Sequence, residues 1–180
     1  MRSMSLIAGA TLVAVCAIAI DTGSAAADAN NPALNGRYLA TSNGEWAMTN
    51  ESFHDEVTVQ SVWTITSSCS TPQDCTGTVT SDEGWTADIT FRSGDKWRVD
   101  REIPNWEPCA DGTAATGLQN YVFWPSETAA APEIAFPRLG KIDMNSPILT
   151  GWQQTTGPSG ACGWNKTLDI RTPFKLVPIA

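Results

Sequence analysis

Apolar residues recur at every second position through the middle of this chain, and that period restricts its possible folds most. In the stretch GWTADITFR, Trp85, Ala87, Ile89 and Phe91 alternate with polar neighbours. Successive strand residues point to opposite faces of a sheet, so the pattern predicts antiparallel strands with one buried and one wet face. The same alternation covers 57–66 and 96–103, where the expected buried residues are Val57, Val59, Trp63, Ile65, Trp97, Val99 and Ile103.

Shorter or less regular segments of the same kind complete the predicted sheet. We expect them at 36–41, 45–50, 76–81, 118–124, 148–154 and 166–177. Pro173 in the last one predicts an edge strand or a bulge, because proline cannot donate to a ladder. The proline-rich stretch 125–147 is expected to be a long irregular loop, placed as a lid or a flank. The expected fold is therefore all-β: an antiparallel up-and-down meander forming a closed or partly open barrel of about eight strands, with a β-sandwich as the alternative.

Two similar hexapeptides, TSNGEW at 41–46 and TSDEGW at 80–85, raise the question of a repeated acidic site. Asn and Asp favour turns, and Asn43-Gly44 suits a two-residue hairpin that needs positive φ. We interpret both hexapeptides as hairpins of one meander. A catalytic carboxylate pair at Asp82 and Glu83 is disfavoured, because neighbouring strand residues point to opposite faces.

The N-terminus has the order of a secretory signal peptide. Arg2 precedes an apolar run over 5–20, and small residues follow at 25–27. This predicts a signal peptide over 1–27 with cleavage after Ala27, or after Ala29 as second choice. An uncleaved membrane anchor is the alternative. A flexible mature N-terminus over 28–35 and a single β domain over 36–180 would follow.

The charge balance excludes some classes of partner. The chain has a formal net charge of −8 at pH 7. An acidic surface repels phosphate backbones and anionic lipid, so nucleic-acid and membrane-surface binding are not expected. No segment beyond the signal peptide is long and apolar enough to span a bilayer. No cofactor is expected, and the sequence does not specify an oligomeric state.

Four cysteines follow the predicted signal peptide: Cys69, Cys75, Cys109 and Cys162. An even number in an exported chain predicts two disulfides, for which three pairings exist. We favour Cys69–Cys75 as a local loop closure, which leaves Cys109–Cys162 to join two distant loops. Their spacing fits no zinc pattern, so no metal site is expected.

Catalytic candidates are few. The one histidine, His54, is followed by Asp55 and Glu56, a set that could supply a general base with an orienting carboxylate. No serine elbow accompanies these residues, and a transition-metal site would recruit more than one histidine. We therefore favour a polar turn before a strand over a hydrolase that uses His54.

The tryptophans fall into two groups. Trp46, Trp63, Trp85 and Trp97 are expected in the core, since they lie on apolar strand faces. Three further tryptophans follow turn-forming residues and could form a pocket rim or a sugar-stacking platform: Trp106, Trp152 and Trp164. Packing on the Cys109–Cys162 disulfide is the reading we favour for Trp106 and Trp164.

Three blocks carry a resemblance to known proteins: TSSCSTPQDCTGTVTSDEGW, IPNWEPCADGTAA and TTGPSGACGWNK. They resemble blocks shared by small exported proteins of mycobacteria and related actinobacteria, which have no assigned activity. The resemblance covers most of 36–176 and all four cysteines. It implies export and a disulfide framework, but no function.

The sequence thus indicates a secreted or cell-envelope protein that binds rather than catalyses. We expect a small apolar or amphipathic cell-envelope ligand held in the barrel mouth. The alternative is a protein or glycan interaction module that uses its loop tryptophans.

Overall fold

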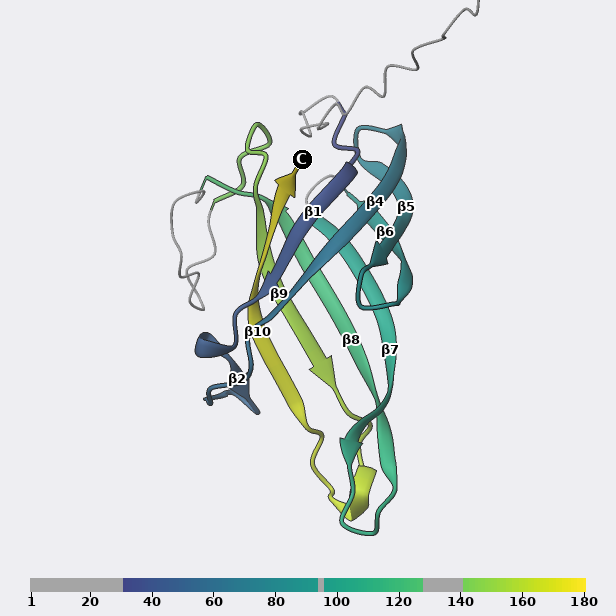
Figure 1. The fold of residues 1–180 in the computed structure, drawn as a ribbon, viewed down its shortest axis with the longest axis vertical. Coiled ribbons are helices and arrows are strands. Elements are labelled where there is room, and N and C mark those ends of the chain that lie inside the picture. The colour runs from purple at the N-terminus through teal and green to yellow at the C-terminus, as the bar shows by residue number, and fades with distance from the viewer. Residues whose placement is uncertain (1–30, 94–95, 128–140) are drawn as a thin grey trace, which may run out of the picture.

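The computed structural model describes residues 31–93, 96–127 and 141–180, so the predicted signal peptide lies outside the described residues. The described residues form ten strands (Figure 1): β1 Asn35–Ser42, β2 Met48–Thr49, β3 Ser52–Phe53, β4 Val59–Thr71, β5 Asp74–Ser81, β6 Thr86–Arg92, β7 Lys96–Pro108, β8 Ala114–Pro125, β9 Leu149–Thr156 and β10 Asp169–Ile179. Two short 3-10 turns accompany them, η1 Gly44–Trp46 and η2 Ala161–Gly163. No helix among the described residues is long and apolar enough to cross a membrane.

Eight of the strands close into an antiparallel up-and-down barrel. They run in the order β1-β4-β5-β6-β7-β8-β9-β10, and β10 pairs with β1 to close the circle. The small hairpin β2–β3 is an addition that pairs with the start of β10. The predicted barrel is confirmed, and it is closed; a sandwich would have left open edges.

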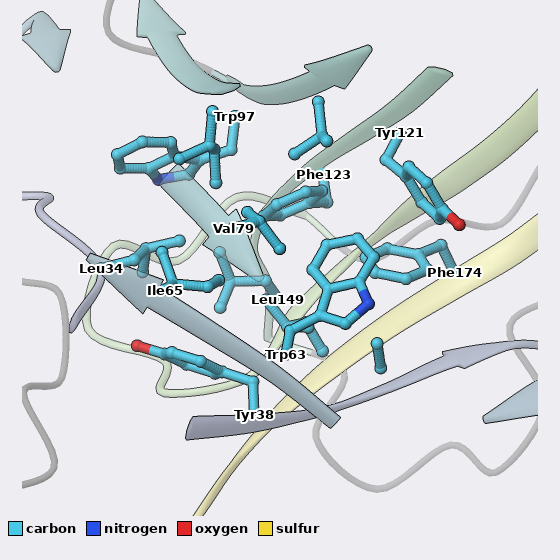
Figure 2. Close-up of a cluster of buried hydrophobic side chains, with 14 of the residues drawn as sticks. Leu34, Tyr38, Trp63, Ile65, Val79, Trp97, Tyr121, Phe123, Leu149 and Phe174 are labelled. Carbon is cyan, nitrogen blue, oxygen red and sulfur yellow. The ribbon is translucent and has the colours of Figure 1, made fainter. Parts of the chain in front are cut away.

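The interior is filled by side chains from the alternating faces (Figure 2). Trp63 lies at its centre and makes edge-to-face contacts with Trp85 and Tyr121, with ring centroids 5.3 and 4.9 Å apart. Aromatic pairs in this arrangement contribute about 0.5–1.5 kcal/mol each beyond the area that they bury. The largest side chains with almost no solvent exposure are Trp63, Trp97, Phe91, Phe123, Phe174, Leu34, Ile65, Ile89, Leu149 and Leu176.

The buried face of β4 begins later than the alternation suggests. Trp63 and Ile65 are buried as predicted, but Val57 and Val59 are 82% and 43% exposed. Val57 precedes β4, and Val59 is its first residue, at the end of the β1 pairing with Ser42. Those two valines therefore lie outside the interior, and Ser61 is the first buried residue of β4.

The first hexapeptide does not form a hairpin, contrary to the prediction. Residues 45–50 form η1 and β2 rather than one strand, and β1 pairs with β4 and β10 instead. Asn43 accepts a hydrogen bond from the Glu45 N–H and so caps η1. Gly44 packs so closely on the next segment that a Cβ would lie 2.0 Å from the Glu56 carbonyl oxygen. The glycine is needed for this close approach and not for a hairpin turn.

The second hexapeptide does form the predicted hairpin. β5 and β6 pair with Thr80 opposite Thr86, and Gly84 in the turn has a φ of 86°. Trp85 then follows on the inward side, partly buried against the core. Similar sequences therefore have different structures: the second hexapeptide joins two strands that pair with each other, whereas β1, at the start of the first, pairs with β4 and β10.

Pro173 was expected to mark an edge strand or a bulge, but β10 has partners on both sides. It pairs with β9 along its length, and on its other side with β2 as far as Arg171 and with β1 from Phe174. The Pro173 carbonyl on that side accepts the Asn43 N–H, at 2.8 Å. The missing proline N–H therefore falls at the change from one partner to the other, where the ladder loses nothing.

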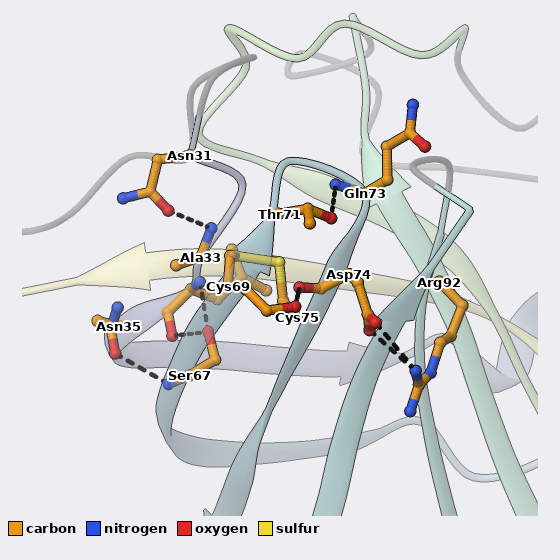
Figure 3. The surroundings of a disulfide bond; sticks show 12 residues. Asn31, Ala33, Asn35, Ser67, Cys69, Thr71, Gln73, Asp74, Cys75 and Arg92 are labelled. Carbon is orange, nitrogen blue, oxygen red and sulfur yellow. Dashed lines mark hydrogen bonds and ion pairs between the residues drawn. A yellow bond between two sulfur atoms is a disulfide. The ribbon is translucent and has the colours of Figure 1, made fainter.

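Both disulfides are present, and their pairing is the one that the sequence favours. Cys69 and Cys75 face each other across β4 and β5 near Ser67 and the Asp74–Arg92 ion pair (Figure 3). Cys109–Cys162 joins the β7–β8 hairpin to η2. In the same region as the first bond, Ser67 exchanges hydrogen bonds with Leu34, which is buried, so packing begins ahead of residue 36. Of the predicted loop 125–147, residues 128–140 lie outside the described part.

Candidate binding groove

A polar groove runs along the start of β10, between the β2–β3 hairpin and η2. Two adjoining hollows form it, with volumes of about 390 and 220 Å³, and they share Asn50, Lys166 and Thr167. Residues that line the larger hollow only are Met48, Glu51, Gln154, Asp169 and Arg171. Residues that line the smaller hollow only are Glu107, Trp164 and Leu168. We call these residues together the groove.

The β2–β3 hairpin is fixed against β10 by its turn. Asn50 and Glu51 have φ values of 48° and 68°, as a two-residue turn with positive φ at both central positions requires. The Asn50 N–H donates to the Asp169 carbonyl at 2.8 Å, and the Asp169 N–H donates to Asn50 Oδ1 at 3.1 Å. This reciprocal pair holds one wall of the groove in place.

The floor of the groove consists of polar side chains that orient one another. Arg171 donates from a terminal guanidinium nitrogen to Gln154 Oε1 at 3.1 Å. Gln154 Nε2 and the Thr156 hydroxyl both donate to Asp169 Oδ2. Polar groups fixed in this way present donors and acceptors in defined directions, which is what recognition of a polar ligand requires.

Both signs of charge occur along the groove, with two positive and three negative side chains. Lys166 and Arg171 carry positive charge, and Glu51, Asp169 and Glu107 carry negative charge. Oε2 of Glu107 is buried and has no hydrogen-bond partner among the described residues. The groove therefore offers acceptors as well as donors, and it does not select strongly for a cation or an anion.

Trp164 forms the open end of the groove. It follows η2, where Cys162 and Gly163 have positive φ values of 54° and 77°. The backbone N–H of Trp164 donates to the Ala161 carbonyl. The Cys109–Cys162 disulfide ties this turn to the β7–β8 hairpin. Trp164 is 69% exposed, although the turn that carries it is held by the disulfide and by this hydrogen bond.

The other two candidate rim tryptophans are packing residues. Trp106 lies half-buried over Gly117, where an added Cβ would be 2.8 Å from the indole. Trp152 makes an edge-to-face contact with Trp124, with ring centroids 5.6 Å apart. Among Trp106, Trp152 and Trp164, Trp164 alone presents an open aromatic face. Of the tryptophans expected in the core, Trp63 and Trp97 are buried, whereas Trp46 and Trp85 are only half-buried.

The catalytic candidates lie on the exposed segment after β3. His54 Nδ1 lies 3.1 Å from Glu56 Oε1, and the Thr49 hydroxyl donates to the same oxygen. The His54 side chain is 68% exposed, and Asp55 beside it is exposed as well. None of these three residues lines the groove, so the structure places them on a surface turn.

A third hollow of about 640 Å³ lies over β7, β8 and β9 and meets the groove at Gln154. Asp100 in this hollow accepts from Arg98 Nε at 2.7 Å and from the Asn120 amide. Leu118, also in its wall, is 61% exposed. It shares only Gln154 with the groove and lies over other strands, so it is a separate hollow.

Sequence reasoning missed most of the groove. Gln154, Asp169 and Arg171 lie on alternate, outward positions of β9 and β10, which are paired so that Arg171 faces Gln154. In the last strand Asp169 and Arg171 flank Ile170 and so lie on the same face. This polar–apolar–polar alternation was the one local signal that could have predicted part of the groove. Nothing local indicated that Asn50, more than a hundred residues earlier, would lie beside them.

Comparison with known proteins places the fold but not the function. No family model matches the chain, and neither does any curated protein sequence. The fold is similar to that of the sensor domain of M. tuberculosis PknI, solved in a monomer form, with a TM-score of 0.53 and 16% identity. That match covers 82% of this chain and 88% of the other. At this identity the likeness establishes a shared fold alone.

Proposed function

We propose that this protein is an exported binding domain that recognises a carbohydrate in the groove. The observation that carries the proposal is the exposed indole of Trp164 at the end of a floor of fixed amide, carboxylate and guanidinium groups. A sugar ring presents C–H bonds on its faces and hydroxyls around its rim. An open aromatic face can stack on the C–H bonds, and hydrogen-bond donors and acceptors can bind the hydroxyls.

The packing of the barrel supports a surface site. Trp63, Phe123 and Phe174 occupy the interior with almost no solvent exposure, so these side chains take the volume that an apolar ligand would need. Barrels of eight strands are just wide enough to be filled by side chains or to hold one small ligand. The expectation of an apolar ligand in the barrel mouth therefore gains no support from the core, and the loop-tryptophan alternative gains support from the groove.

The context of the chain agrees with a binding role outside the cytoplasm. Two disulfides are typical of exported proteins, and a signal peptide is predicted ahead of the described residues. One structural neighbour is named a sensor domain, and a binding role for this chain agrees with that name. The polar groups of the groove are hydrogen-bonded to one another, an arrangement suited to holding a ligand.

The test is binding of the oxidised protein to an array of defined oligosaccharides that are neutral, N-acetylated or acidic. Hits are then titrated by calorimetry with Trp164→Ala and with Leu118→Ala as the matched control, since both residues are large, apolar and exposed. Loss of a stacking partner should weaken binding about tenfold or more, whereas the control should bind as the wild type does. The proposal would be refuted if no oligosaccharide on the array bound, or if Trp164→Ala bound the hits as tightly as the wild type does.

A further inference from the structure

A second surface beside the groove carries exposed apolar side chains that do not line it. Residues 44–59, which we call the knob, comprise η1, the β2–β3 hairpin and the segment that leads into β4; the knob projects from the side of the barrel (Figure 1). Within it Phe53, Val57 and Val59 are 65%, 82% and 43% exposed. Trp46 is half-buried and meets Phe53 edge to face, with ring centroids 6.5 Å apart.

The apolar side chains are exposed on an ordered support. The Glu56 N–H donates to the Gly44 carbonyl at 3.0 Å, and the His54 N–H donates to the Ala47 carbonyl at 3.1 Å. Gly44 is buried against the backbone of Glu56 and Val57. Side chains of this size on a fixed backbone are typical of an interaction surface rather than of scattered surface residues.

The knob is also strongly acidic. Between Arg37 and Arg92 the chain contains eight acidic residues and no lysine or arginine. Four of them belong to the knob: Glu45, Glu51, Asp55 and Glu56. A second copy of this chain would bring like charges together at this surface, so charge complementarity points to a cationic partner.

The knob also has an unpaired strand edge. β3 is the last strand of the sheet beyond β10 and β2. In this hairpin the Thr49–Ser52 pair flanks the turn, and the His54 N–H donates to the Ala47 carbonyl. The Met48–Phe53 pair lies between these two pairs and is a non-hydrogen-bonded pair of the ladder. In an antiparallel ladder such a residue directs its N–H and C=O away from its partner strand. Phe53 therefore offers one donor and one acceptor at the sheet edge.

We propose that the knob is a docking site for an extended, cationic segment of a partner protein, with basic and apolar residues in alternation. The segment pairs with the edge of β3 at Phe53 and places its apolar side chains against Phe53 and Val57. Its basic side chains meet Glu45, Asp55 and Glu56. This is the mode in which a peptide adds a strand to an open sheet edge, and it does not depend on the groove binding a carbohydrate.

The probe is a synthetic peptide of alternating lysine and valine, about ten residues long, with a matched peptide in which every lysine is glutamate. Binding to the oxidised protein is measured by calorimetry at about 50 mM and about 500 mM salt. Phe53→Ser/Val57→Ser should weaken binding of the lysine peptide about tenfold or more, and Leu118→Ser should leave it unchanged. Glu45→Gln/Asp55→Asn, which alters charge only, should weaken it about threefold to tenfold at the lower salt and little at the higher.

Three results would overturn the proposal. The first is a glutamate peptide that binds as tightly as the lysine peptide at the lower salt, where charge matters most. The second is that Phe53→Ser/Val57→Ser and Glu45→Gln/Asp55→Asn both bind the lysine peptide as tightly as the wild type does. If the serine variant fails to fold, wild-type affinity in the charge variant alone overturns the proposal. The third is a dimer in sedimentation that Phe53→Ser/Val57→Ser converts to monomer, because the surface would then receive a second copy.

Discussion

The disulfide between Cys109 and Cys162 should contribute more to stability than the one between Cys69 and Cys75, although Cys75 is the buried cysteine. The two bonds span sequence separations of 53 and 6 residues. Cross-linking restricts the unfolded chain more as the closed loop lengthens. The chain-entropy relation gives about 4 kcal/mol for the longer loop and about 2 kcal/mol for the shorter.

Packing narrows this difference without reversing it. Cys75 is 1% exposed and belongs to the core cluster, so alanine there loses about a further 1 kcal/mol of buried contact. Cys109 and Cys162 are half-buried, and their loss should act mainly on the unfolded state. We therefore expect Cys109→Ala/Cys162→Ala to lower the free energy of unfolding by about 4 kcal/mol and Cys69→Ala/Cys75→Ala by about 3 kcal/mol.

Equilibrium urea unfolding followed by tryptophan fluorescence measures both values, because Trp63 and Trp97 lie in the core. The slope of the free energy against urea should also rise more in Cys109→Ala/Cys162→Ala, since the uncrosslinked chain exposes more surface on unfolding. A larger loss in Cys69→Ala/Cys75→Ala would refute the reasoning from loop length. So would unchanged slopes in both variants.

Two further predictions concern the barrel. Gly151→Ala should lower the free energy of unfolding by about 3 kcal/mol or more, because its Cβ would lie 1.9 Å from the Val122 carbonyl oxygen. Gly112→Ala, where the space is open but φ is +84°, should cost only about 1–2 kcal/mol in the same urea assay, and equal losses would contradict the steric argument. Burial raises the pKa of Tyr121 to about 12. The neutral phenol therefore stabilises the fold fully below about pH 10, and this contribution, about 2–3 kcal/mol, is lost as the pH rises through about 12. Urea unfolding at stepped alkaline pH should show a shallower decline in Tyr121→Phe, and an unchanged decline would contradict the assignment.

The strands themselves could be predicted because their signal is local. Trp85, Ala87, Ile89 and Phe91 alternate with polar residues, and β6 covers them with Ile89 and Phe91 fully buried. A residue's side of a strand follows from its position in the chain, whatever the neighbouring strands are. The same holds for the β5–β6 hairpin, whose two strands are adjacent in sequence.

Errors arose where the outcome depended on distant residues. Val57 and Val59 fit the alternation but lie outside the interior, because the pairing of β4 with β1 ends at Val59. Asn43-Gly44 has the chemistry of a hairpin turn, yet Gly44 is buried against the backbone of Glu56 and Val57. A turn signal says that the chain can bend, but not which segment it will then meet.

By itself, the sequence determined an all-β, antiparallel domain with paired cysteines, because alternation and cysteine number are properties of short segments and of composition. Tertiary structure alone decided how that domain presents a site. Asn50 meets Asp169 because β2 pairs with β10, and Trp164 lines a hollow with Glu107, where a disulfide ties η2 to the β7–β8 hairpin. Contacts between residues so far apart depend on the closure of the whole barrel, and no short stretch of sequence specifies that closure.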